Sequence, residues 1–74
     1  MGAAPDPIIA VRDRAYDLAS TGQFTYWRDI VSVLQSEGAY ALSVSRLDAQ
    51  PYFQMMLRFR IREAKRRLLV APKG

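Results

Sequence analysis

Residues 51–69 read PYFQMMLRFRIREAKRRLL, a pattern that predicts the longest helix of the chain. Apolar side chains recur in this segment every three or four residues, which places them along one side of an α-helix. Pro51 suits the first turn, because the amide hydrogen that proline lacks would have no partner within the helix there. The stripe expected to face the core consists of Phe53, Leu57, Ile61, Ala64 and Leu68.

The same helix carries most of the positive charge. Residues 58–74 hold seven Lys and Arg side chains and one acid, a net charge of +6, whereas residues 1–57 have a net charge of −2. Such a polarised charge attracts polyanions, although cations near the end of a helix can also form a solvated face that complements the helix dipole. The residues expected to contact phosphates of a nucleic acid share one face: Arg58, Arg62, Lys65 and Arg66.

A second apolar group flanks the core stripe of this helix. It consists of Tyr52, Met56 and Phe59, which we expect to form a partner or dimer surface. This group leaves a second function open, that of a protein–protein interaction module or small homodimeric adaptor. In that case the C-terminal helix would dock on an acidic or apolar surface of its partner.

The N-terminal part predicts a first amphipathic helix. Its start is marked by Asp6, whose side chain can cap a helix, followed by Pro7 at the first helical position. Ser-Thr-Gly at residues 20–22 predicts its end. We expect the chain to consist of a flexible N-terminal arm over residues 1–5, a single helical domain over residues 6–70 and a flexible C-terminal tail over residues 71–74.

A second helix is predicted from Thr25 to about Glu37. Thr25 is expected to be the N-cap, because its hydroxyl can accept a hydrogen bond from the first turn. Gly38 is expected to end the helix in the left-handed conformation. We expect Trp27, on the apolar face of this helix, to be buried.

Residues 39–47 fit two kinds of secondary structure. Tyr40, Leu42 and Val44 alternate with small residues as in a strand, but Tyr40, Val44 and Leu47 also share one face of a helix. We favour a short helix, because no other segment predicts a strand that could pair with this one. The predicted fold class is therefore all-α, a small bundle of three to four helices.

Residues 27–47 also fit the order helix, tight turn, helix, with Gly38 in the turn. The apolar residues that would wedge the two helices together are Val33, Val44 and Leu47. In this arrangement the segment resembles the helix-turn-helix DNA-binding superfamily, from which it departs at Leu34 and Glu37. The resemblance implies that three side chains of the second helix are presented to DNA bases: Ser43, Ser45 and Arg46.

Two alternatives remain open at this point. The segment around Arg46 can be a plain connector in a helical bundle, with Arg46 a solvated charge. Aromatic side chains can also stack on single-stranded bases, although a chain this short needs most of them in its core. The aromatic residues concerned are Tyr26, Trp27, Tyr52, Phe53 and Phe59.

The composition argues against catalysis. Cysteine and histidine are absent, which removes disulfides, thiolate nucleophiles, imidazole bases and the common zinc sites. The acidic residues are scattered, and neither a phosphate-binding glycine loop nor a nucleophile motif is present. We therefore expect no enzyme, no metal and no cofactor.

No segment approaches the roughly 18 apolar residues that a membrane span needs, and no secretion signal is evident. We expect a cytoplasmic, non-enzymatic nucleic-acid-binding protein that forms a homodimer. Duplex DNA is the expected partner, and an acidic protein surface is the alternative.

Overall fold

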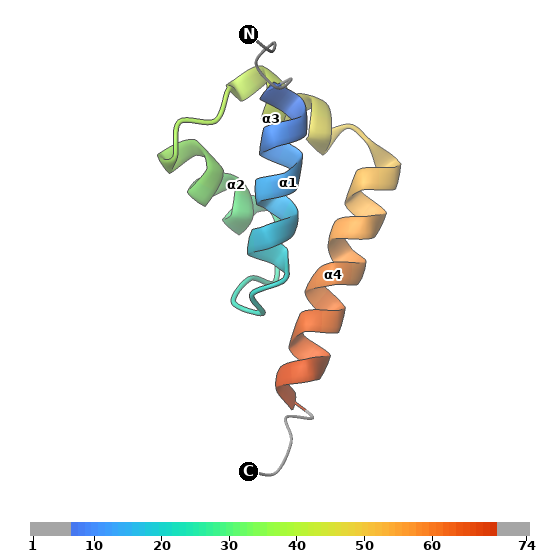
Figure 1. The fold of residues 1–74 in the computed structure, drawn as a ribbon. Coiled ribbons are helices and arrows are strands. Elements are labelled where there is room, and N and C mark those ends of the chain that lie inside the picture. The colour runs from blue at the N-terminus through green and yellow to red at the C-terminus, as the bar shows by residue number, and fades with distance from the viewer. Residues whose placement is uncertain (1–6, 70–74) are drawn as a thin grey trace, which may run out of the picture.

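The computed structural model describes residues 7–69, and this part of the chain folds into four α-helices without a strand. The predicted all-α class is confirmed, and so is the short helix favoured for residues 39–47. α1 lies in the middle and packs against each of the other three helices, while α3 also packs on α4 (Figure 1). The helices are α1 (Pro7–Ala19), α2 (Trp27–Ser36), α3 (Ala41–Asp48) and α4 (Pro51–Leu69).

The ends of α1 follow the sequence signals. The helix begins at Pro7 and ends at Ala19, just before Gly22 adopts a positive φ of 80°. The hydroxyl of Thr21 donates a hydrogen bond to the Leu18 carbonyl oxygen at 2.7 Å, which satisfies one of the last acceptors of the helix. Asp6, the predicted arm and the predicted tail lie outside the described residues.

α2 begins two residues later than its predicted cap. Thr25 is not the N-cap; Tyr26 occupies that position in an extended conformation, and its side chain makes no capping hydrogen bond. The physical reason is tertiary, because the indole nitrogen of Trp27 donates a hydrogen bond to Asp48 Oδ1 at 2.8 Å and its ring packs on Phe53. These contacts outweigh the preference for a capping threonine, worth only about 1 kcal/mol.

The end of α2 forms as predicted. Gly38 has a φ of 87°, a conformation that costs glycine little. The amide of Gly38 donates to the carbonyl oxygen of Gln35 at 3.1 Å, and the amide of Ala39 donates to that of Leu34 at 3.0 Å. This pair of bonds is a Schellman motif, which satisfies the last carbonyl groups of α2 before the chain turns into α3.

The core joins all four helices around one aromatic side chain. Phe53 of α4 is 1% exposed and lies between Tyr16 of α1 and Trp27 of α2, with both ring centroids 5.3 Å away. Trp27 itself is only half-buried, so the prediction that it is buried was wrong; its indole edge reaches the surface to bond Asp48. The other buried apolar side chains are Val11, Ala15, Leu18, Ala19, Ile30, Leu34, Val44, Leu47, Leu57, Ile61 and Ala64.

α4 continues past the end of α1, as Figure 1 shows. Four of the five residues of its predicted core stripe are buried, but Leu68 is 61% exposed, which corrects that part of the prediction. Leu68 lies beside Gly22 in the loop after α1, where an added Cβ atom would come within 2.5 Å of Leu68 Cδ1. All described side chains from Arg66 to Leu69 are exposed.

An ion pair joins α1 to the end of α2. Arg14 Nε donates to Glu37 Oε1 at 3.0 Å, and Arg14 Nη2 donates to Glu37 Oε2 at 2.7 Å. These hydrogen bonds and the attraction between the charges hold the pKa of the Glu37 carboxyl below its usual value and raise the pKa of Arg14, while desolvation opposes both shifts. The geometry is bidentate, the strongest form of such a pair.

Glu37→Gln is expected to lower the stability of the fold at about pH 7 and to have no effect at about pH 2. Because the pKa of Glu37 is lowered on folding, the pair stabilises the fold above the pKa of the unfolded chain. That contribution is lost as the pH falls through the lowered pKa, where the wild-type carboxyl becomes neutral as well. Urea unfolding of both proteins at the two pH values measures this, and an equal difference at both would contradict it.

Candidate nucleic-acid interface

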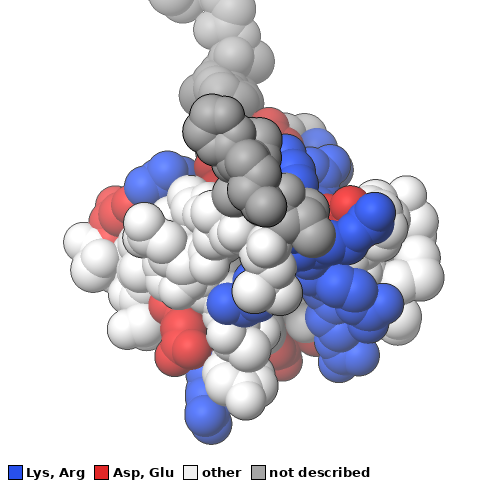
Figure 2. All heavy atoms as spheres, turned by 90° about the horizontal axis from the view of Figure 1, so that it is seen from below, with Lys and Arg blue, Asp and Glu red and all other residues white. Residues whose placement is uncertain are grey.

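The four predicted phosphate-binding residues lie on one side of α4. Arg58, Arg62 and Arg66 are exposed and Lys65 is half-buried. Arg62 is three or four residues from each of the others, so their side chains are neighbours on successive turns of the helix. Figure 2 shows the end of the molecule at which α4 finishes, and the largest group of Lys and Arg atoms gathers on one side of it.

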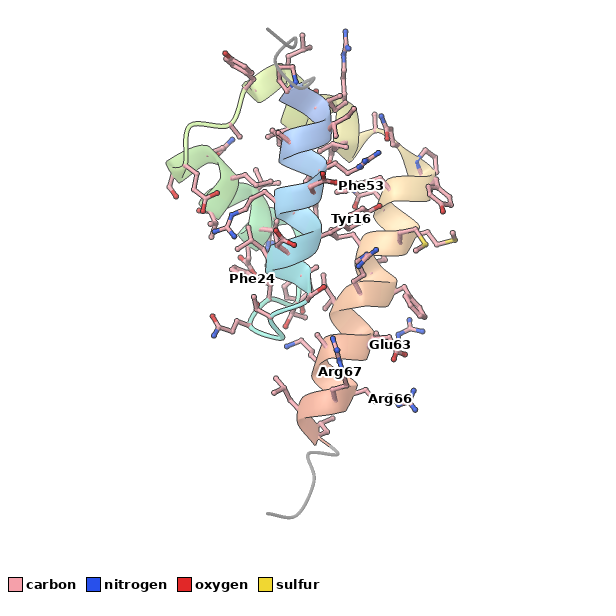
Figure 3. The ribbon with its side chains drawn as sticks, in the orientation of Figure 1. Tyr16, Phe24, Phe53, Glu63, Arg66 and Arg67 are labelled. Atoms are coloured by element: carbon pink, nitrogen blue, oxygen red, sulfur yellow. The ribbon has the colours of Figure 1, made fainter. Side chains whose placement is uncertain are left out.

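These cations are poorly neutralised. Arg66 faces Glu63 at 3.6 Å, and Figure 3 shows both side chains pointing away from the bundle. Arg58, Arg62 and Lys65 have no acidic partner within 4 Å among residues 7–69. Unpaired guanidinium groups keep their donors available for a phosphate.

Arg60 has a different role, which the sequence pattern did not show. Its guanidinium lies over the ring of Tyr16, with the central carbon 4.4 Å from the ring centroid. This cation–π contact fastens α4 to α1. Arg60 therefore belongs to the frame of the bundle rather than to the predicted phosphate-binding face.

Two hollows flank Arg58. The first, of about 490 Å³, lies on α4 itself and is lined by Pro51, Gln54, Met55, Arg58, Phe59 and Arg62. The second, of about 570 Å³, lies between α4, the end of α3 and the start of α2. It is lined by Thr25, Tyr26, Trp27, Asp48, Gln54, Leu57, Arg58 and Ile61.

The second hollow includes Tyr26 and Trp27, which the sequence indicated only under the alternative of base stacking. Tyr26 is 57% exposed, and the guanidinium of Arg28 lies 5.1 Å from the centre of its ring. In the sequence, the only sign of a site here is a tyrosine followed two positions later by an arginine. Only the folded chain shows that Tyr26 and Arg58 border the same hollow.

The predicted apolar patch of α4 is present, but Met55 takes the place of Met56 in it. Tyr52 and Phe59 are exposed as expected, at 69% and 53%. Met56 is half-buried, whereas its neighbour Met55 is 57% exposed and lines the first hollow. The outer surface of α4 is therefore formed by Tyr52, Met55 and Phe59 together with the basic residues.

The three residues suggested for base contacts are not equivalent. Ser43 is buried, at 7% exposed, and lines the same hollow as Arg46. Ser45 is exposed and lines a groove of about 390 Å³ between α2 and α3. Arg46 is exposed but borders a different hollow, together with Pro7 at the start of α1. The structure thus separates Arg46 from the hollows beside Arg58.

The described part of the chain offers no other obvious chemistry. Within residues 7–69, no three acidic, His or Cys side chains are grouped so that they could hold a metal ion. None of the helices in that range combines the length and the apolar character needed to cross a membrane. No protein-family model, curated protein or solved structure matches this chain. The candidate interface contains arginines and aromatic rings, which can bind anions and stack on flat rings.

Proposed function

We propose that this is a small non-enzymatic nucleic-acid-binding protein that contacts phosphates through α4, with DNA as its partner. One observation carries the proposal: Arg58, Arg62 and Lys65 lie on one side of α4 with no acidic partner within reach in the described chain. Ordinary solvated helix faces mix charges of both signs, which cancel at long range. An uncompensated group favours a polyanion.

The dimensions agree with this function. Arg58 and Arg66 are eight residues apart, which is about 12 Å along a helix and comparable to the reach of a few backbone phosphates. Arginine, which predominates over lysine on this face, forms forked hydrogen bonds to phosphate oxygens. Such contacts would fix the position of α4 on the backbone without selecting a sequence.

Binding to nucleic acid is expected to weaken steeply as salt is added. Each neutralised phosphate of a duplex contributes about −0.9 to the slope of log affinity against log salt concentration, so four contacts predict a slope of about −3.6. Fluorescence anisotropy of a labelled DNA duplex over a series of salt concentrations measures the slope. A protein that binds neither DNA nor RNA at low salt would refute the proposed function.

A second candidate function rests on Tyr52, Met55 and Phe59. Three large apolar side chains exposed within two turns of one helix are typical of a protein contact, which fits a homodimer or an adaptor for an acidic partner. The basic residues would then meet carboxylates instead of phosphates. Sedimentation at increasing protein concentration tests the homodimer directly.

A further inference from the structure

The hollow between α4 and the start of α2 is lined by two aromatic side chains. Tyr26 is exposed and Trp27 half-buried, and the buried Leu57 and Ile61 line the hollow from α4. A nucleobase has two apolar faces and a polar edge, and it stacks well on aromatic side chains. The volume of about 570 Å³ exceeds what a single base requires, so a base can enter with part of its sugar.

Acceptor groups border the same hollow. Asp48 accepts the indole hydrogen of Trp27 through Oδ1, which leaves Oδ2 without a hydrogen bond in the described chain. Gln54 donates through Nε2 to the Leu47 carbonyl oxygen at 3.2 Å, which leaves its side-chain oxygen able to accept. Carboxylate and amide oxygens accept hydrogen bonds from the amino groups of bases.

Arginine side chains lie in and near the hollow. Arg58 lines it from α4 and has no ion-pair partner among the described residues, while Arg28 lies over the ring of Tyr26. Arg62 follows one turn after Arg58. The phosphate of an inserted nucleotide would thus have Arg58 beside it, and Arg62 would be available to the next phosphate along α4. This charge complementarity points to a nucleotide as the occupant and argues against an apolar peptide side chain.

We infer that this hollow receives an unpaired base, so that the protein binds single-stranded nucleic acid in preference to duplex. The inference rests on the proposed function, because the phosphate contacts of α4 hold the strand beside the hollow. In a duplex the faces of the bases are stacked on one another and cannot reach Tyr26. A preference for single strands over duplex therefore indicates that a base enters the hollow, because attraction to backbone phosphates alone does not require unpaired bases.

The test compares four probes of equal length: a DNA strand of mixed sequence, the same strand without bases, its duplex, and the RNA version of the strand. The abasic strand keeps every phosphate and loses only the rings. We expect the DNA or RNA strand to bind about tenfold more tightly than the abasic strand, since stacking one base contributes about 1–3 kcal/mol. Trp27, the only tryptophan, lines the hollow, so its fluorescence reports occupancy.

Substitutions of Tyr26 test whether the difference in affinity between intact and abasic strands depends on this hollow. Tyr26→Ala is expected to lower the affinity for the intact strand to that for the abasic strand, and Tyr26→Phe to retain most of it. Tyr40→Ala is the matched control, because Tyr40 is also an exposed N-cap tyrosine without a capping hydrogen bond, but it precedes α3. Tyr40→Ala should bind like the wild type. Circular dichroism checks that each variant is folded.

The outcomes are distinguishable. A higher affinity for either intact strand that disappears in Tyr26→Ala supports the inference, and comparison of the DNA and RNA strands identifies the nucleic acid. Equal affinities for intact strand, abasic strand and duplex would overturn it while leaving phosphate binding by α4 intact. Binding of none of the probes would overturn both. Capture of a peptide in the hollow, with no effect of Tyr26→Ala on nucleic acid, would also overturn it.

Discussion

Phe53→Ala is expected to leave most of the protein unfolded at room temperature. Replacing a buried phenylalanine by alanine costs about 3–5 kcal/mol, because apolar contacts are lost and a cavity remains. A single core in a chain of this size seldom provides more than about 3–5 kcal/mol in total. Phe53 is nearly fully buried and contacts rings from α1 and α2, so the surrounding helices cannot easily close the gap.

Urea unfolding followed by circular dichroism measures this effect, and Phe59→Ala is its control. Phe59 is on the same helix but 53% exposed, so its replacement should change the free energy of unfolding by only about 0.5 kcal/mol. Similar losses for the two variants would show that Phe53 does not occupy the centre of the core.

Charge reversal at Arg62 and Arg66 is expected to reduce nucleic-acid affinity at low salt by at least about 100-fold. Each charge-assisted hydrogen bond contributes about 1.5–3 kcal/mol, and two are lost together. The variant Arg62→Glu with Arg66→Glu also lowers the net charge from +4 to 0, which removes the long-range attraction. Anisotropy titration with the labelled strands gives the affinities.

Arg12→Glu is the control for the single variant Arg62→Glu, since both change the net charge by the same amount. Arg12 is exposed on α1, where it contacts only Asp13 at 3.4 Å. Equal losses in the two single variants would mean that overall charge, rather than the face of α4, governs binding. Phe59→Ala combined with Met55→Ala should retain nucleic-acid affinity, and a loss of self-association in that variant would favour the second candidate function.

The helices were predictable because their signals are local. Pro7 and Pro51 begin helices where their missing amide hydrogen does no harm, and Gly38 ends one where a positive φ is required. The stripe of α4 was predictable as far as Ala64 because helical spacing alone determines which residues share a side. The charge of the face containing Arg58 followed from the same spacing.

The wrong predictions concern positions whose surroundings depend on segments far away in the sequence. The start of α2 depends on the bond from Trp27 to Asp48, which no pattern within α2 contains. Leu68 has the spacing of a core residue but is 61% exposed, because α4 continues past the end of α1. Ser43 is polar yet buried, because the side of α3 that packs inward includes it.

The candidate site could be predicted only in part for the same reason. Its basic residues lie on one helix and could be grouped by spacing. The hollow beside Arg58 needs Tyr26 and Asp48 as well, which come from the start of α2 and the end of α3. Sequence alone shows no reason for these three residues to meet.

The extension of α4 beyond α1 links the charge of the protein to its local order. From Arg66 to Leu69 the helix has little tertiary support, and helical turns in that situation open at a free-energy cost close to zero. Repulsion between neighbouring arginines opposes the closed form further. A bound polyanion would remove that repulsion and order these turns. The free-energy cost of ordering them would lower the net affinity. We therefore expect the last turn of α4, which carries Arg66 and Arg67, to open more readily than the turns that pack on α1.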